Sequence, residues 1–248
     1  MTYCVGVQVD EGLVMVSDSR TNAGVDQVST YSKMWSVGVP GERQFMICSA
    51  GNLATTQAVL NEVKRDAKEG AETSLMTVSS LTQAAAYLGR LSIEEQKKHA
   101  EQTLDPGGMQ MFSSSFIIAG EVAGSEPGLY LVYPEGNYIA SSSQAPFLQI
   151  GEIKYGKPIL DRVISRSTDL NHAALCALVS MDGTMRSNLT VGPPIELSIY
   201  TAGSLQPPRY ISFDQDSEYL RSLSKTWNRL LEQAFEKLPL IPLAESQP

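Results

Sequence analysis

The chain has 248 residues, of which 42% are hydrophobic and 19% are charged, and its formal net charge is −8. This balance is typical of a globular protein with enough apolar material for a core. The negative charge argues against a nucleic-acid partner, because phosphate contacts need a basic surface. The sequence shows no apolar run of membrane-spanning length and no signal-peptide pattern, so we expect a cytoplasmic protein without a membrane partner.

The first fifty residues predict strands. Residues 2–9 alternate between two faces, and the Asp10-Glu11-Gly12 turn leads into a second strand at 13–16, which indicates a hairpin. A further pair of strands is expected at 33–39 and 43–49. Four strands should therefore precede the first helix.

The apolar residues then recur at helical spacing. A first helix is expected from residue 52 to Gly70, and a second helix begins at residue 81 and runs into a charged surface near residue 101. The rest of the chain is expected to form strands at 112–119, 129–133 and 138–140, helices at 158–164 and 170–181, strands at 195–200 and 210–213, and a last helix at 220–235.

Strands and helices thus come in blocks, which excludes a doubly wound parallel sheet. Two antiparallel sheets would need helices on their outer faces. We therefore predict an α+β fold, a four-layer α-β-β-α sandwich of two antiparallel sheets flanked by helices. No repeat or linker divides the sequence, so we expect a single domain over residues 1–248, with a C-terminal helix and short tail from about residue 216.

The cysteines and histidines give little support for metal or disulfide chemistry. Cys4, Cys48 and Cys176 lie in apolar segments without the spacing of a metal site, which indicates reduced thiols in the core. His99 and His172 are far apart, and we interpret both as structural. We therefore expect no metal and no cofactor, and any catalytic base must come from another group.

Thr2 is the first candidate for chemistry. Initiator methionine is usually removed before a small residue, so we expect a mature chain of residues 2–248. A free N-terminal threonine carries a hydroxyl nucleophile and an amine base on one residue. Taken alone, Thr2 fits equally well as the start of a strand, where β-branched residues are common.

A series of polar motifs follows Thr2 along the chain: Ser-Asp-x-Arg at 17–20, then Lys33, and then Ser-Ala-Gly at 49–51 before a helix. In this order they resemble the proteasome β-subunit family of N-terminal threonine hydrolases. The sequence is still more similar to the bacterial ancestral β-subunit branch, Anbu, through MTYC, SDSRTNAGVD and SNLTVGPPIEL. The resemblance covers nearly the whole chain. It implies the N-terminal nucleophile hydrolase fold, threonine-type cleavage of a peptide or amide substrate, and a homo-oligomer that forms a ring or an open helix.

The expected chemistry is consistent with the resemblance. A lysine ammonium beside the Thr2 amine would favour the neutral amine and the developing alkoxide, and Lys33 would supply it. Asp18 would hold Lys33 charged and oriented. The alternative for Asp18 and Lys33 is a surface ion pair of little value, and Arg20 could pair with Asp18 equally well.

Gly51 and its neighbours complete the predicted site. The backbone N–H of Gly51 can approach an oxyanion at a strand-to-helix turn, and the family assigns the oxyanion hole there. The alternative is a turn glycine with an unusual φ. The resemblance also implies that Thr21, Asn22 and the backbone from Ser49 bind an extended substrate as an added strand.

Two positions depart from the proteasome pattern. Glu152 stands where a Gly-Ser-Gly step has serine, and Ser187 stands where a later motif has aspartate. A carboxylate near the Thr2 amine would raise the pKa of that amine rather than lower it. The leading hypothesis is a self-assembling threonine peptidase of the proteasome type. The alternatives are an amidase for non-peptide amides with the same nucleophile, or an assembly protein with little turnover.

Overall fold

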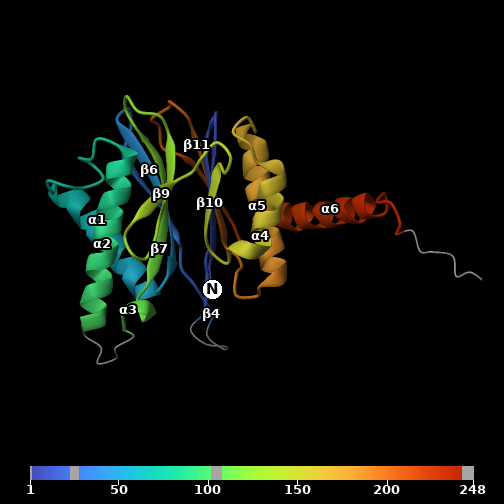
Figure 1. Ribbon diagram of the computed structural model, residues 1–248, viewed down its shortest axis with the longest axis horizontal. Coiled ribbons are helices and arrows are strands. Elements are labelled where there is room, and N and C mark those ends of the chain that lie inside the picture. The colour runs from blue at the N-terminus through green and yellow to red at the C-terminus, as the bar shows by residue number, and fades with distance from the viewer. Residues whose placement is uncertain (1, 23–27, 102–107, 242–248) are drawn as a thin grey trace, which may run out of the picture. The chain divides into compact units, whose positions relative to one another are not determined.

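The computed structural model describes residues 2–22, 28–101 and 108–241 (Figure 1). The chain divides into two compact units, residues 1–215 and residues 216–248. The first unit contains the strands and helices α1–α5, and the second contains helix α6 (Glu218–Phe235). Among the described residues, no helix is both long enough and apolar enough to cross a membrane. The single hydrolase domain remains a prediction.

Two antiparallel five-stranded sheets form the centre of the first unit (Figure 1). The first sheet has the order β10-β1-β2-β11-β12, with strands Phe147–Gly151, Tyr3–Val9, Gly12–Asp18, Ile195–Thr201 and Arg209–Phe213. The second sheet has the order β5-β6-β7-β8-β9, with strands Met34–Val39, Arg43–Gly51, Ser114–Val122, Gly128–Val132 and Tyr138–Ala140. Each sheet therefore combines strands from distant parts of the sequence.

Side-chain alternation along the strands builds two apolar layers. In β6, Phe45 and Ile47 belong to the cluster that packs under helices α1 and α2. Met46 and Cys48, which alternate with them, belong to the cluster between the two sheets. The second sheet is thus apolar on both faces, as a sandwich interior requires.

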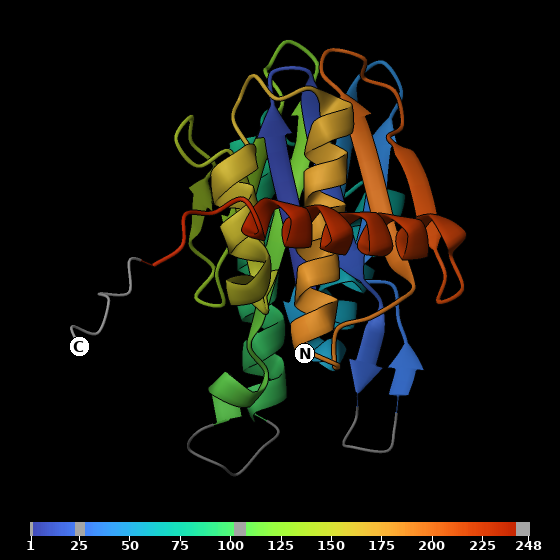
Figure 2. The ribbon, with the colours of Figure 1, turned by 90° about the vertical axis from the view of Figure 1, so that its right-hand side faces the viewer.

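Helices cover the outer faces of both sheets. Helices α1 (Leu53–Glu69) and α2 (Leu81–Glu101) cover the second sheet (Figure 1), and α4 (Ile153–Val163) and α5 (Leu170–Ser187) cover the first sheet (Figure 2). Helix α1 ends at Gly70 in the left-handed conformation, as its sequence predicts. The predicted four-layer α-β-β-α sandwich is confirmed.

Several element predictions were wrong in detail. Six strands, rather than four, precede α1 in the described chain, because β3 (Arg20–Asn22) and β4 (Val28–Thr30) form a short ribbon without an apolar alternation. Strand β10 and the short helix α3 (Gly108–Met111) were also missed. Helix α4 begins at Ile153 instead of residue 158. Pro158 lies inside this helix, at an exposed position, and not at its start. Helix α5 continues to Ser187, beyond the predicted end at 181.

Candidate active site

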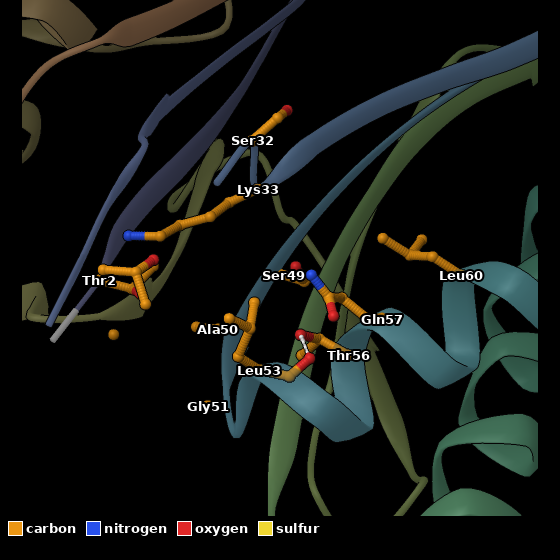
Figure 3. A pocket seen from close by; sticks show the side chains of 12 residues that line it. Thr2, Ser32, Lys33, Ser49, Ala50, Gly51, Leu53, Thr56, Gln57 and Leu60 are labelled. Atoms are coloured by element: carbon orange, nitrogen blue, oxygen red, sulfur yellow. Dashed lines mark hydrogen bonds between the residues drawn. The ribbon is translucent and has the colours of Figure 1, made fainter. Parts of the chain in front are cut away.

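A cavity of about 390 Å³ opens at the ends of β6 and β10, beside the first turns of α1 (Figure 3). It is lined by Thr2, Thr21, Ser32, Lys33, Ser49, Ala50, Gly51, Leu53, Thr56, Gln57, Leu60 and Gly151. The structure therefore brings five of the predicted site residues to one cavity, namely Thr2, Thr21, Lys33, Ser49 and Gly51. Asn22 is the last residue of β3, next to Thr21.

Two hydrogen bonds fix the backbone at Thr2 and Tyr3. The carbonyl oxygen of Thr2 accepts a hydrogen bond of 2.7 Å from the Glu152 N–H, and the next N–H, that of Tyr3, donates to Asp18 Oδ1 at 3.0 Å. Tyr3 also pairs with Gly151 across β1 and β10. Thr2 is therefore fixed at the start of β1, and the residue remains partly exposed. Met1, whose removal we predicted, lies outside the described residues.

Gly151 permits this close contact. Its φ is +83°, and a Cβ at this position would lie 1.9 Å from the Thr2 carbonyl oxygen. No side chain fits at that distance, and the φ value also favours glycine. The glycine at the end of β10 is therefore required for Thr2 to lie in this position.

Asp18 and Lys33 form a buried ion pair. Lys33 Nζ lies 2.7 Å from Asp18 Oδ1 and also donates to the Arg20 carbonyl oxygen at 2.6 Å. The Lys33 side chain is 6% exposed and the Asp18 side chain 0%, so the alternative interpretation of a surface ion pair is wrong. Arg20 Nη1 instead donates to the Leu189 carbonyl oxygen at 2.6 Å. Lys33 extends toward Thr2 in the cavity (Figure 3).

The Asp18 carboxylate is held by backbone donors as well. Besides the Tyr3 N–H, the Gly192 N–H donates to its Oδ2 atom at 3.3 Å. Burial raises the pKa of the Asp18 carboxyl above its ordinary value, and the Lys33 ammonium and these hydrogen bonds partly offset that rise. Asp18 therefore connects the start of β1, the Lys33 segment and the loop before β11.

Gly51 ends β6 at a tight strand-to-helix turn. Its φ is +114°, and an added Cβ would lie 2.4 Å from the Ser113 carbonyl oxygen. Asn52 follows as the N-cap of α1, and its side chain accepts a hydrogen bond from Thr55 N. The turn therefore requires glycine at position 51, and it brings the positive end of the α1 dipole to the cavity.

The two departures from the proteasome pattern, Glu152 and Ser187, are linked by Asn188, the residue after Ser187. Glu152 is 8% exposed, and its Oε2 atom accepts a 3.0 Å hydrogen bond from Asn188 Nδ2. Asn188 Oδ1 in turn accepts hydrogen bonds from Thr190 N and Thr190 Oγ1. Ser187 itself is exposed at the end of α5. Sequence reasoning missed Asn188, although it stands next to the position that was compared.

The histidines and cysteines are not among the described residues that line the cavity. His99 stacks on Phe112, and His172 Nδ1 contacts Asp169 at the start of α5. The three cysteines are free and buried. Among the described residues, no group of three or more His, Cys, Asp and Glu side chains could hold a metal ion.

Comparison with known proteins identifies the family. The model of the proteasome subunit family matches residues 2–199. The chain belongs to the proteasome subunit family. No curated protein matches its sequence.

Solved structures of Anbu, the ancestral beta-subunit, are similar over nearly the whole chain. Anbu from Yersinia bercovieri is 39% identical with a TM-score of 0.91, and the alignment covers 97% of this chain and 100% of that one. The structure described as a helical assembly of the Anbu complex from Pseudomonas aeruginosa is 40% identical with a TM-score of 0.90, over 98% and 100% of the two chains. The predicted resemblance is confirmed, and the chain is an N-terminal nucleophile hydrolase-like proteasome subunit.

Proposed function

We propose that this family member is a threonine hydrolase that cleaves peptide or other amide bonds with Thr2 as its nucleophile. The observation that supports this proposal most strongly is the buried Asp18–Lys33 pair, whose ammonium lines the same cavity as Thr2. Buried ion pairs contribute little net stability, so a pair at the wall of a cavity favours a functional role. Removal of Met1 would supply the free amine that the reaction needs.

In the proposed reaction the amine of Thr2 accepts the proton of the Thr2 hydroxyl, whose oxygen attacks the substrate carbonyl. The Lys33 ammonium favours the neutral amine and the developing alkoxide, and Asp18 keeps that ammonium in place. The amine then returns the proton to the leaving nitrogen, which departs and leaves an ester on Thr2. Water hydrolyses the ester and restores the hydroxyl.

The tetrahedral intermediate needs donors for its oxyanion. We assign this role to the Gly51 N–H, because Gly51 lines the cavity and directly precedes the N-terminus of α1. Thr21, Asn22 and the backbone from Ser49 would bind the substrate as an added strand. These roles rest on the family resemblance and, except for Asn22, on the position of the residues around one cavity.

The remaining cavity wall indicates the side chain that the substrate presents. Leu53 and Leu60 are apolar, Ser32, Thr56 and Gln57 are polar but neutral, and Lys33 is the one charged residue among the described lining residues. Since Asp18 already neutralises Lys33, we infer a neutral substrate side chain of moderate size.

We also propose that the chain forms a homo-oligomer in the cytoplasm, without a membrane or nucleic-acid partner. The Anbu complex from Pseudomonas aeruginosa is described as a helical assembly. The candidate contact surfaces are the charged end of α2, residues 93–101, and α6, which carries Leu220, Leu223, Trp227 and Leu230 along one stripe. Light scattering at micromolar concentration tests this proposal, and a strictly monomeric mass would overturn it.

The activity is tested with fluorogenic peptide amides and small non-peptide amides. The chain that begins at Thr2 should hydrolyse amides with neutral side chains, and Thr2→Ala should abolish turnover without changing fold or assembly. Turnover only of the non-peptide amides would assign an amidase. Equal turnover by Thr2→Ala would exclude Thr2 as the nucleophile.

A further inference from the structure

Glu196 is a buried carboxylate that accepts hydrogen bonds from many directions. It lies in β11 and is 4% exposed. Its Oε2 atom accepts from Ser17 Oγ at 3.3 Å, Ser19 Oγ at 3.1 Å and Lys33 N at 3.3 Å. Its Oε1 atom accepts from Ser32 Oγ and Tyr210 OH, both at 2.7 Å.

Most of these donors belong to the two segments that carry the proposed ion pair. Ser17 and Ser19 flank Asp18, and Ser32 precedes Lys33, whose own N–H is another donor. Ser32 and Lys33 also line the cavity. The Glu196 carboxylate therefore joins the end of β2 to the segment before β5, directly beside the Asp18–Lys33 contact.

A carboxylate suits this position better than other side chains do. It is acceptor-only when ionised and offers about four lone-pair sites, so it can satisfy donors that converge on both oxygens. Glu196 forms no ion pair with any residue that the structure describes, so hydrogen bonds alone offset its burial. A glutamine amide would accept on one oxygen only and would direct N–H groups at the remaining donors.

We propose that Glu196 is a positioning residue that holds the Ser32–Lys33 segment against β2, so that the Lys33 ammonium reaches both Asp18 and the cavity. Its link to catalysis rests on the proposed threonine hydrolase function. Its effect on the position of Lys33 does not depend on that function, and the two parts can be tested separately.

The chain offers a matched control in Glu121. This carboxylate is 5% exposed and accepts hydrogen bonds from Tyr200 OH at 2.7 Å and Gly203 N at 2.9 Å. Glu121 lies near the C-terminal end of β7, whereas Ser114, which pairs with Gly51, lies at the N-terminal end of that strand. Like Glu196, Glu121 accepts hydrogen bonds from a tyrosine hydroxyl and from a backbone N–H. It lies about 23 Å along β7 from the end of that strand that borders the cavity.

The test compares Glu196→Gln with Glu121→Gln in the full chain that begins at Thr2. Both changes should lower the melting temperature. Glu196→Gln alone should lower kcat per folded molecule, with a smaller change in KM, by roughly the 10- to 100-fold found for residues that orient metal ligands through hydrogen bonds. Tyr210→Phe removes one donor and keeps the carboxylate, so its kcat should fall less than that of Glu196→Gln.

Crystal structures of both variants supply a readout that does not need activity. In Glu196→Gln, Lys33 Nζ should leave the hydrogen-bond distance to Asp18 Oδ1, whereas Glu121→Gln should retain it. An unchanged Lys33 and a kcat equal to that of Glu121→Gln would overturn the proposal. A wild-type chain without turnover would refute the proposed function, while the Lys33 position would still decide the role of Glu196. If Glu196→Gln does not fold, Tyr210→Phe and Ser32→Ala each remove one donor and provide the same comparison in milder form. If Lys33 stays in place in both of these variants, the proposal is overturned.

Discussion

Lys33 Nζ contacts Asp18 Oδ1 at 2.7 Å, and Asp18 also accepts the N–H of the residue directly after Thr2. One carboxylate thus fixes the ammonium and the backbone next to the proposed nucleophile. Burial of such a pair is costly in solvation, and its attraction repays that cost only with good geometry and further hydrogen bonds. The Tyr3 and Gly192 N–H groups supply those bonds.

Breaking the pair should separate its structural role from its catalytic role. Lys33→Met leaves an unpaired buried carboxylate and should cost about 3–5 kcal/mol of unfolding free energy. The double variant Asp18→Asn with Lys33→Met should recover most of that loss, because neither member of the pair then leaves an unpaired charge. Urea unfolding measures both values, and peptide hydrolysis should stay absent in each variant. Hydrolysis restored in the double variant would refute a catalytic role for the ammonium.

The raised pKa of Asp18 predicts a specific dependence of stability on pH. The unfolded carboxyl has a pKa of about 3.9, and burial raises the pKa of the folded Asp18 carboxyl above that value. Between the two values the folded chain binds more protons than the unfolded chain, so this group's contribution to stability falls as pH rises through that window. Asp18→Asn has no such titration. The unfolding free energy of the wild type minus that of Asp18→Asn should therefore decrease as pH rises above about 4.

This difference is measured by urea unfolding at a series of pH values, with the two proteins side by side. A difference that instead increases with pH would mean that the folded pKa is lowered, and that the Lys33 ammonium outweighs burial.

Gly151→Ala should displace Thr2. The new Cβ would meet the Thr2 carbonyl oxygen at 1.9 Å, in addition to the strain of a φ of +83°. Gly41→Ala is the control, because Gly41 has a φ of +81° and no heavy atom within 4 Å of the added Cβ. The control should lose about 1–2 kcal/mol from its conformation alone. Gly151→Ala should lose more, together with hydrolysis. Thermal unfolding and turnover check this, and equal behaviour of the two variants would contradict it.

The neutral cavity wall predicts a change of substrate preference. Gln57→Lys places a cation at the cavity and should favour acidic substrate side chains by roughly 1.4- to 5-fold, as for an exposed ion pair of about 0.2–1 kcal/mol. Asn61→Lys adds the same charge on an exposed position of α1 and should change nothing. The measurement is the ratio of kcat/KM for acidic and neutral peptide amides. A ratio that shifts equally in both variants would place the substrate side chain elsewhere.

The parts of the fold that sequence predicted are those determined by local patterns. The hairpin of β1 and β2 follows from alternation around a turn, and α1 follows from helical spacing that ends at Gly70. The ribbon of β3 and β4 was missed because short polar strands carry no apolar alternation. Pro158 was taken as part of the helix start, although it lies inside α4 at an exposed position.

The site shows the same division. Thr2, Asp18 and Lys33 stand in an order along the chain that the family resemblance makes recognisable, and the structure places Thr2 and Lys33 at one cavity with Asp18 bonded to Lys33. Glu196 could not be predicted, because its partners come from β2, the segment before β5 and β12. Sequence spacing carries no signal for donors that meet only in the folded chain.

The most direct test of Thr2 is its covalent modification. A peptide epoxyketone with a neutral side chain reacts with a hydroxyl and a free amine on the same residue, so it reports both groups that the mechanism needs. Intact mass spectrometry should compare the chain that begins at Thr2, the chain that retains Met1, and Thr2→Ala. We predict one adduct, located on Thr2, in the first chain and none in the other two. Labelling of the Met1-bearing chain or of Thr2→Ala at the same rate, or no labelling of the chain that begins at Thr2, would contradict the proposed mechanism.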